Sequence, residues 1–432
     1  MMITNIGTIF AEKLDGKDIA LRGWVHRHRA SGNMVFAVMR DPTGIIQIAV
    51  KKDKVGEKDW KDANSAYVES SFTITGRVKK DDRAPGGYEI EAAGFTLISQ
   101  GEPFPIAKDL SDEYLLDVRH LWLRSQKMTS IMKARHHIVN YLREFFEVEG
   151  FYEMAPPIIT KSACEGGSTL FEMDYFGDKA YLTQSSQMYA EVFIFSLGKV
   201  YVLAPSFRAE KSRTIRHLAE YWHLEPEMAF YDHKMNVDLQ ESMVKYTVGK
   251  MVENYSDLLK ACGREPEDLM ATIQNPFRRM EYKVAVEEVN EAGGKMDFGQ
   301  DFGADEEALL TKGATEPIFV TKFPKEIKAF YMKEDPTDPE FVLNDDLLAP
   351  AGHGEIIGGS ERIWHYDELI ARMKEQNLNI KDYQWYVDLR RYGSVPHSGY
   401  GLGVERLVKW ILNLDHIRDA IPFPRNITRC YP

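Results

Sequence analysis

"SFRAEKSRTIRHLAEYWHLEPEMAF", residues 206–230, is the most informative stretch of the chain. Its two ends are apolar enough to pair as the strands of a hairpin, and the segment between them is dense in charged residues. Isolated surface ion pairs are common and weak, but they explain poorly so many charges beside one aromatic side chain. The pattern therefore predicts a hairpin that presents binding or catalytic residues. The charged candidates are Arg208, Glu210, Arg213, Arg216, His217, Glu220, Glu225 and Glu227, and the aromatic side chain is Tyr221.

Two later stretches carry chemistry of the same kind. In "PHSGYGLGVERLVKWIL", from Pro396, a predicted glycine-rich turn runs into a helix, and glycine lets a ligand approach the backbone closely. Arg406 then stands in the first helical turn, where it can stack on a base or hold phosphate oxygens. In "GHGEIIGGSER", from Gly352, a predicted Gly-Gly-Ser bend separates Glu355 from Arg362. The acid could hold Mg²⁺, and the cation could hold a carboxyl or amide oxygen.

The elements around these stretches indicate the fold class. Apolar periodicity predicts amphipathic helices over 125–149 and 235–261. Strand-like runs at 199–208, 220–231 and 317–323 are mixed with the helices without a regular βαβ alternation. This mixture favours an α+β domain built on an antiparallel sheet. The chain contains neither a GxxxxGK[ST] nor a GxGxxG phosphate loop, so another scaffold must hold ATP if ATP is used.

The N-terminal part has a different pattern. Residues 19–99 read as five short strands separated by Gly, Asp and Pro turns, which predicts a small closed barrel of the OB type that binds oligonucleotides on one face. Because the formal net charge is −12, a polyanionic partner must meet a local basic face. Seven Lys and Arg against two Asp between residues 22 and 54 could supply it, although such a run could equally be a solvated surface.

These patterns predict three segments: an OB-fold domain over 1–103, a proline-punctuated hinge over 104–124, and a catalytic domain over 125–432. The chain has no apolar run long enough to cross a membrane, and its N-terminus lacks the order of a signal peptide. Its three cysteines form no CxxC pair, which argues against disulfides and a cysteine zinc site. We therefore expect a soluble, cytoplasmic protein with no membrane partner.

Together these stretches resemble the class II aminoacyl-tRNA synthetases of the aspartyl/asparaginyl group, in their compact archaeal form. "GFYEMAPPII" (150–159) resembles the first motif of the family, "FRAE…RHLAEY…E" the second and "GLGVERL" the third. "GWVHRHRASGNMVFAVMRDPTGIIQ" (23–47) is similar to the family's anticodon-binding barrel. The resemblance spans about residues 20–430. It implies an antiparallel-sheet catalytic domain of the class II type, an N-terminal OB-fold and a homodimer.

The resemblance also implies an ATP site. Arg208 would contact the α-phosphate, and Tyr221 and Arg406 would lie on opposite faces of the base. Arg216 and His217 would hold the outer phosphates. Such a site suits adenylate chemistry, which needs charge neutralisation and in-line positioning more than it needs a base. The implied ATP-binding residues are Arg208, Glu210, Arg216, His217, Tyr221, Glu355 and Arg406.

Mg²⁺ is assigned to Glu355 by the same resemblance, with Asp346 as its partner. Asp346 and Glu355 are two residues farther apart in this sequence than the corresponding acids usually are in the family. With Arg208 and Arg406, Glu355 would make up the catalytic group.

The amino acid would lie beside these groups. Glu165, in the loop "CEGGST", would pair with the α-ammonium, helped by Ser185 and Gln187, and the two glycines would let the loop act as a lid. Glu225 and Arg362 would contact the side chain of the amino acid.

In the barrel, the resemblance implies that Phe36 stacks on an anticodon base and Gln47 reads a base edge, with Arg29 beside them. The alternative is that Phe36 is a core residue on an alternating strand.

The stretch "TQSSQMYAE", residues 183–191, bears on which amino acid is bound. In aspartyl enzymes the matching stretch carries a lysine where this chain has Ala190, and that ammonium pairs with the carboxylate of the substrate. Arg362 can donate to one side-chain oxygen, which aspartate and asparagine both offer. Glu225, when ionised, can accept from an amide NH₂ but would repel the second oxygen of aspartate if no lysine compensates it. Aspartyl relatives carry an acid at this position too, so the absent lysine carries the inference more than the glutamate does. The sequence therefore favours L-asparagine and tRNA(Asn) as substrates.

The predicted reaction is ATP-dependent formation of an aminoacyl adenylate, followed by esterification of the terminal 3′-hydroxyl of the tRNA. Aspartate specificity is the first alternative. A non-catalytic RNA-binding relative would be favoured by loss of Arg208, Arg406 or the metal acid, and all of these are present. The predicted barrel argues against an amino-acid amide synthetase with the same catalytic core.

Overall fold

The computed structural model describes residues 2–107, 110–161, 164, 170–211 and 214–432. The chain forms two compact units, Met1–Leu115 and Leu116–Pro432. The division falls inside the predicted hinge, which contains the helices α3 (Asp112–Asp117) and α4 (Arg119–Trp122). The predicted domain limits 1–103 and 125–432 leave these two helices outside both domains. Those limits stay predictions.

The first unit is a barrel, closed because β2 pairs with both β3 and β5. Side chains of β5 are buried alternately, and Phe72 stacks on Phe95 inside the barrel with ring centroids 4.4 Å apart. All five predicted strands are confirmed: β2 (Asp18–Ser31), β3 (Met34–Asp41), β4 (Gly44–Lys51), β5 (Ser71–Lys80) and β6 (Tyr88–Ser99). The sequence patterns did not predict β1 (Met2–Ile3), α1 (Ile6–Glu12) and α2 (Glu57–Ser65).

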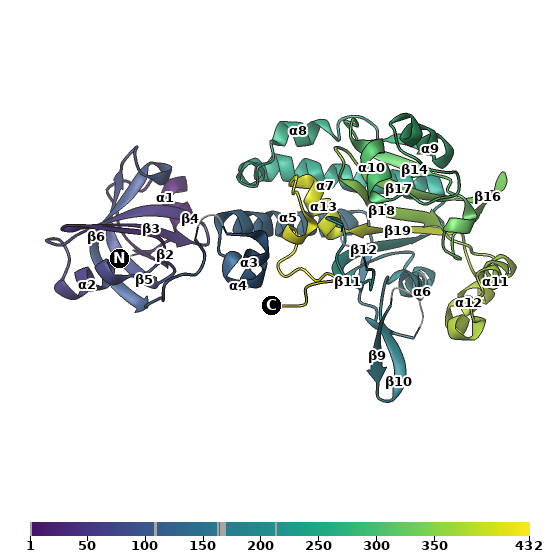
Figure 1. Cartoon of the computed structure of the whole chain (residues 1–432), viewed down its shortest axis with the longest axis horizontal. Helices are drawn as coiled ribbons and strands as arrows, with labels where there is room; N and C mark the ends of the chain where they lie inside the picture. Colours follow the sequence, from purple (N-terminus) through teal and green to yellow (C-terminus); the bar gives the residue numbers. More distant parts are fainter. Residues whose placement is uncertain (1, 108–109, 162–163, 165–169, 212–213) are drawn as a thin grey trace. The chain divides into compact units, whose positions relative to one another are not determined.

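The second unit is built on an eight-stranded, mainly antiparallel sheet, as predicted, and Figure 1 shows helices around it. Among the described residues, the parallel strand pairs of this sheet are β13–β14 and β7–β11, and its other pairs are antiparallel. In spatial order the strands are β13 (Arg278–Glu281), β14 (Ile318–Thr321), β17 (Asn344–Ala349), β18 (Gly354–Glu361), β19 (His397–Gly403), β12 (Glu220–Ala229), β11 (Lys199–Phe207) and β7 (Tyr152–Met154).

Helices pack on both faces of this sheet. α5 (Gln126–Val148) and α7 (His233–Ala261) confirm the two predicted long helices and share one apolar core with Leu224 and Met228 of β12. α6 (Gln187–Leu197) packs against β11 and β12 through Ala190 and Ile194. The remaining helices of eight or more residues are α9 (Tyr282–Glu291), α10 (Ala304–Thr311), α11 (Tyr366–Glu375), α12 (Gln384–Arg391) and α13 (Val404–Ile411).

Two predicted turns are in fact strands. The Gly-Gly-Ser bend lies inside β18, and the glycine-rich turn before α13 is β19. A Cβ on Gly399 would lie 2.1 Å from Glu227 Oε1, and one on Gly401 would lie 2.4 Å from His223 Nε2. The prediction was wrong because these glycines provide room for side chains of the neighbouring strand β12 and do not turn the chain.

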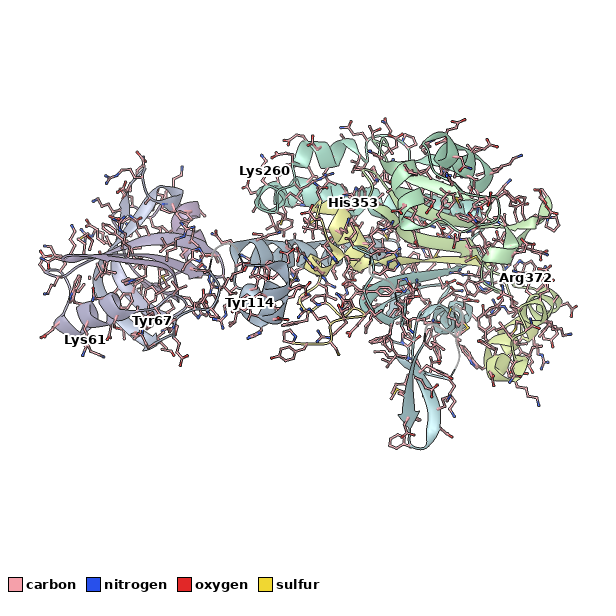
Figure 2. The ribbon with its side chains drawn as sticks, in the orientation of Figure 1. Lys61, Tyr67, Tyr114, Lys260, His353 and Arg372 are labelled. Carbon is pink, nitrogen blue, oxygen red and sulfur yellow. The ribbon has the colours of Figure 1, made fainter. Side chains whose placement is uncertain are left out.

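The helices α11 and α12 pack together at one side of the second unit. Arg372 of α11, labelled in Figure 2, donates from Nη2 to the carbonyl oxygen of Lys325, 3.0 Å away. Leu369, Met373 and Tyr386 pack together in one apolar core. None of the helices in the described part of the chain is both long enough and apolar enough to cross a membrane.

Candidate active site

A cavity of about 530 Å³ lies on the face of the eight-stranded sheet opposite α5 and α7. Its walls come from β12, β17, β18 and β19 and from the loop that joins β11 to β12. Glu165 and the rest of the predicted lid, residues 165–169, lie outside the described residues. Of the predicted hairpin, Glu220 and Glu227 do not line the cavity, and Arg213 lies outside the described residues. The other residues that the resemblance assigns to ligands in this unit all line it: Ser185, Gln187, Arg208, Glu210, Arg216, His217, Tyr221, Glu225, Asp346, Glu355, Arg362 and Arg406.

Strand alternation explains why the hairpin carries so many of these residues. β11 and β12 pair antiparallel from Lys199–Met228 to Phe207–Glu220, which confirms the predicted hairpin. Because successive side chains of a strand point to opposite faces, Leu224 enters the core shared with α5 and α7. Glu225 therefore points toward the cavity.

At one end of the cavity, Arg362 forms a buried ion pair with Glu227. Its Nη2 lies 2.5 Å from Glu227 Oε1 and its Nε lies 3.3 Å from Oε2. Nη1 donates to Ser360 Oγ at 2.6 Å. Burial acts to lower the pKa of Arg362, but Glu227 raises it, so the guanidinium stays charged. Glu227 thereby fixes the plane of Arg362, while N–H groups of both Nη atoms remain available for a ligand.

Glu225 lies beside this pair in a different environment. Ser185 Oγ donates to its Oε1, and the backbone N–H of Ser186 donates to Oε2 at 2.8 Å. His223 Nδ1 lies 3.3 Å from Oε1. Burial raises the pKa of Glu225, although the hydrogen bonds from the two serines act to lower it. Glu225 is thus a fixed acceptor next to Arg362.

The other end of the cavity contains Arg208 and Arg406. The guanidinium carbon of Arg208 lies 5.7 Å from the ring centroid of Tyr221. Arg406 Nη1 donates to Glu355 Oε2 at 2.8 Å and to the carbonyl oxygen of Glu355 at 3.1 Å. Burial alone would raise the pKa of Glu355, but Arg406 lowers it to about 2. This end therefore combines guanidinium groups, an aromatic face and an ionised carboxylate.

Arg216 has N–H groups that could bind an anion. Its Nη2 lies 2.5 Å from Glu307 Oε2, which also accepts from the backbone N–H of Glu355. Among the described residues, Nε and Nη1 of this buried arginine have no hydrogen-bond partner. His217, next in the chain, forms a hydrogen bond between its Nδ1 and Thr214 Oγ1. Burial lowers the pKa of His217 most, and the positive charge of Arg406 lowers it further. These groups suit the outer phosphates predicted for Arg216 and His217.

Asp346 and Glu355 face the same cavity from neighbouring strands. Asp346 lies opposite Gly358 in the β17–β18 pair, and Leu348 lies opposite Glu355. An irregularity in the register between Leu347 and Leu348 turns both acids to one face of the sheet. Their separation in the sequence is therefore no obstacle to a shared site.

Lys328 is the present partner of Asp346, with Nζ 3.0 Å from Oδ2. Burial acts to lower the pKa of Lys328, but Asp346 and Asp301 raise it. In the described residues, no group of three or more His, Cys, Asp or Glu side chains is arranged to hold a metal. Mg²⁺ commonly takes only one or two carboxylates together with waters and phosphates, so Glu355 and Asp346 fit this ion when a nucleotide is present.

In the first unit, the predicted anticodon residues lie together on β2, β3 and β4. Arg29 pairs with Phe36 in register, and Gln47 pairs with Val38. All four line a shallow cavity of about 370 Å³. Phe36 is 38% exposed, which excludes the alternative of a core residue. Gln47 donates from Nε2 to Glu89 Oε2 at 2.8 Å.

Comparison with known protein families agrees with this geometry. The model of the family described as tRNA synthetases class II (D, K and N) matches residues 111–427, and that of the OB-fold nucleic acid binding domain matches residues 19–98. The chain belongs to the class II tRNA synthetases. These synthetases are ligases, so the cavity is the candidate active site of an enzyme.

Several known proteins match this chain over nearly its whole length. The asparagine–tRNA ligase of Thermoplasma acidophilum is 48% identical, over 99% of this chain and 100% of its own. The solved asparaginyl-tRNA synthetase from Pyrococcus horikoshii, complexed with asparaginyl-adenylate, is 47% identical, with a TM-score of 0.94 over 97% of each chain. The aspartyl-tRNA synthetase from Entamoeba histolytica is 25% identical, with a TM-score of 0.84 over 99% of this chain and 92% of its own.

Several charged residues that line the cavity were not assigned to the site from the sequence, among them Glu307 and Lys328. Glu227, a candidate of the predicted hairpin without a stated role, follows Glu225 by two residues on the same face of β12 and pairs with Arg362. Glu307 lies on α10, 91 residues after Arg216, and Lys328 lies after β14, 18 residues before Asp346. No local pattern links these distant partners.

Proposed function

We propose that this synthetase is an asparagine–tRNA ligase, which activates L-asparagine with ATP and transfers it to tRNA(Asn). The observation that carries the proposal is the residue at position 190, an alanine in the apolar cluster between α6 and β11. Ala190 is fully buried against Val200 and Val202, so no cation projects from the position where aspartyl relatives are expected to have a lysine. The similarity to asparagine–tRNA ligases along nearly the whole chain supports it.

Selection between the two amino acids follows from the two groups at that end of the cavity. Arg362, fixed by Glu227, donates to the side-chain oxygen that asparagine and aspartate share. Glu225 accepts from the amide NH₂ of asparagine but meets the second oxygen of aspartate as a like charge. Without a compensating lysine, aspartate is rejected by repulsion and by the buried polar groups that it leaves unpaired.

The first half-reaction takes place between the two ends of the cavity. The α-carboxylate of asparagine attacks the α-phosphorus of ATP, a carboxylate oxygen–phosphorus bond forms, and the bond to the β-phosphate oxygen breaks with release of pyrophosphate. Arg208 stabilises charge on the α-phosphate, and Tyr221 and Arg406 hold the base. Arg216 and His217 contact the outer phosphates. Mg²⁺, held by Glu355 and Asp346, would supply further neutralisation of phosphate charge.

The second half-reaction uses the first unit for recognition. The 3′-hydroxyl of the tRNA attacks the carbonyl carbon of the adenylate, an ester forms, and AMP leaves. Phe36, Arg29 and Gln47 provide a stacking face, a cation and an amide edge for the anticodon. Because ribosomes consume charged tRNA, we place the enzyme in the cytoplasm.

A homodimer is part of the proposal. β7 is the edge strand of the large sheet, and three apolar residues next to or near it are exposed: Val148, Tyr152 and Ile159. Exposed apolar groups beside an unpaired edge favour contact with a second copy of the chain. Light scattering after size exclusion should give twice the mass of one chain, and replacement of Tyr152 by Arg should shift the protein toward monomer.

Aminoacylation tests the proposed function as a whole. The purified protein is expected to attach radiolabelled asparagine to a tRNA(Asn) transcript in the presence of ATP. Failure to charge that tRNA, together with charging of tRNA(Asp) by aspartate, would contradict the assignment while leaving the family unchanged.

A further inference from the structure

A buried carboxylate next to the cavity has no role in the reaction described above. Glu191 lies on α6, one helical turn after Gln187, and is completely buried. Gln187 Nε2 donates to its Oε1 at 3.1 Å. Tyr386 Oη lies 2.8 Å from both carboxylate oxygens, while Arg390 Nη2 and His397 Nε2 lie 2.6 Å and 2.9 Å from Oε2. Four side chains from three elements thus converge on one carboxylate.

Arg390 keeps this carboxylate charged. Arg390 is itself buried, and its Nε donates to the carbonyl oxygen of Ile363, so the guanidinium is held in one orientation against Glu191. Burial acts to raise the pKa of Glu191, but Arg390 and His397 lower it. An ionised carboxylate can only accept hydrogen bonds.

The charge of Glu191 determines which way the amide of Gln187 points. Because Glu191 offers no donor, the amide NH₂ of Gln187 must face it, and the amide oxygen must be turned away. Gln187 lines the cavity, and its backbone N–H donates to Ser185 Oγ at 3.1 Å, which anchors the start of α6. The site thereby gains an acceptor suited to an ammonium group.

We propose that Glu191 is a positioning residue for the amino acid, which acts by orienting Gln187 so that its amide oxygen accepts from the α-ammonium. The inference rests on the proposed function, because it needs an amino acid in the cavity. Glu191 does not touch the substrate. Its effect should therefore appear in the KM for asparagine, pass through Gln187 and leave the KM for ATP unchanged.

A double-mutant cycle tests this coupling by amino-acid-dependent ATP–pyrophosphate exchange. The variants are Glu191→Gln, Gln187→Met and the two combined. Glu191→Gln should raise the KM for asparagine by about tenfold or more, the effect of a lost charge-assisted hydrogen bond, and should not change the KM for ATP. In the Gln187→Met background the second change should add almost nothing, because the amide that Glu191 orients is already gone. Additive effects, or an equal rise in the KM for ATP, would overturn the proposal.

A second variant decides the question if Glu191→Gln does not fold. In Gln187→Glu, a protonated carboxyl can still donate to Glu191 and present its carbonyl oxygen to the ligand, whereas an ionised one meets Glu191 as a like charge. Arg390, His397 and Tyr386 contact Glu191 directly, and the charges of Arg362 and Glu227 act on it from farther away; all five groups are the same in the parent. The KM for asparagine should therefore rise with pH in Gln187→Glu, relative to the parent at each pH. A KM that falls with pH would show that the acceptor needs no orientation by Glu191. Asparagine-dependent exchange by the parent, measured first, tests the proposed function separately.

Discussion

Arg362 and Glu227 form a two-bonded ion pair, with Nη2 2.5 Å from Oε1 and Nε 3.3 Å from Oε2, and both side chains are almost fully buried. Such a pair fixes the plane of a guanidinium, which can then present its remaining N–H groups in one direction. The cavity thus contains an arginine paired with a buried carboxylate and an acid, Glu225, whose closest partners among the described residues are two serines and His223. The proposed choice of an amide over a carboxylate rests on this difference together with the alanine, in place of a lysine, at position 190.

Replacing Glu227 by Gln should destabilise the protein, because it removes the carboxylate that is hydrogen-bonded to the buried charge of Arg362 and leaves the more distant Glu191 as the described acid that still stabilises that charge. Breaking a buried pair in this way typically costs about 3–5 kcal/mol. The exposed Arg278–Glu288 pair has a similar two-bonded geometry, so Glu288→Gln is a matched control and should cost about 0–1 kcal/mol. Denaturant unfolding of both variants measures the difference. Equal destabilisation would mean that burial of the Arg362 pair has no special importance.

Replacing Arg208 by Ala tests the nucleotide end of the cavity. The ATP–pyrophosphate exchange rate should fall by on the order of 10²-fold or more, the scale seen when a donor that stabilises transition-state charge is lost. Circular dichroism and thermal unfolding should stay close to those of the parent. Exchange at the parent rate would remove Arg208 from the α-phosphate.

Phe36→Ala separates recognition of tRNA from adenylate formation. Because Phe36 is exposed on the barrel, exchange should remain nearly intact. Binding of tRNA(Asn) should weaken by about 1–3 kcal/mol, the contribution of one stacked base. The buried Phe72 is the control position, since Phe72→Ala should destabilise the barrel itself. If Phe36→Ala lowers exchange and tRNA binding equally, the proposed anticodon contact is wrong.

The Arg406–Glu355 pair predicts a pH dependence of stability. The pKa of Glu355 is lowered to about 2 in the folded protein, below its ordinary value of 4.5. A lowered carboxyl pKa contributes stability that is present above the unfolded pKa and is lost as pH falls toward the folded value. The free energy of unfolding should therefore differ most between the parent and Glu355→Gln at neutral pH, and the difference should shrink from pH 5 downward. A difference independent of pH would contradict the ionised pair.

Patterns within one element predicted the fold class and the hairpin correctly, whereas the roles of the site residues stay predictions. Arg208 and Glu225 belong to that single hairpin, and both line the cavity. Partners that come from distant elements, such as Glu307 for Arg216, leave no local signal because the fold alone brings them together. Gly399 misled the prediction because glycine serves equally in turns and in close side-chain packing.

Ala190→Lys probes the position that separates the two amino acids. Asparagine-dependent exchange should fall, and aspartate-dependent exchange should rise, because an added ammonium can compensate the second carboxylate oxygen. Ala190 is fully buried among Ile194, Val200 and Val202, so the variant should also unfold at a lower temperature. Unchanged exchange with both amino acids would show that this position does not contribute to specificity.

The central claim is the choice of asparagine, and ATP–pyrophosphate exchange by the unmodified protein tests it most directly. Exchange is measured in parallel with asparagine and with aspartate, each purified to remove traces of the other, at the same ATP and Mg²⁺ concentrations. We expect asparagine to support exchange with a kcat/KM about 10⁴-fold above that of aspartate, the discrimination that a site built on specific hydrogen bonds can reach. Comparable exchange with aspartate would contradict the claim.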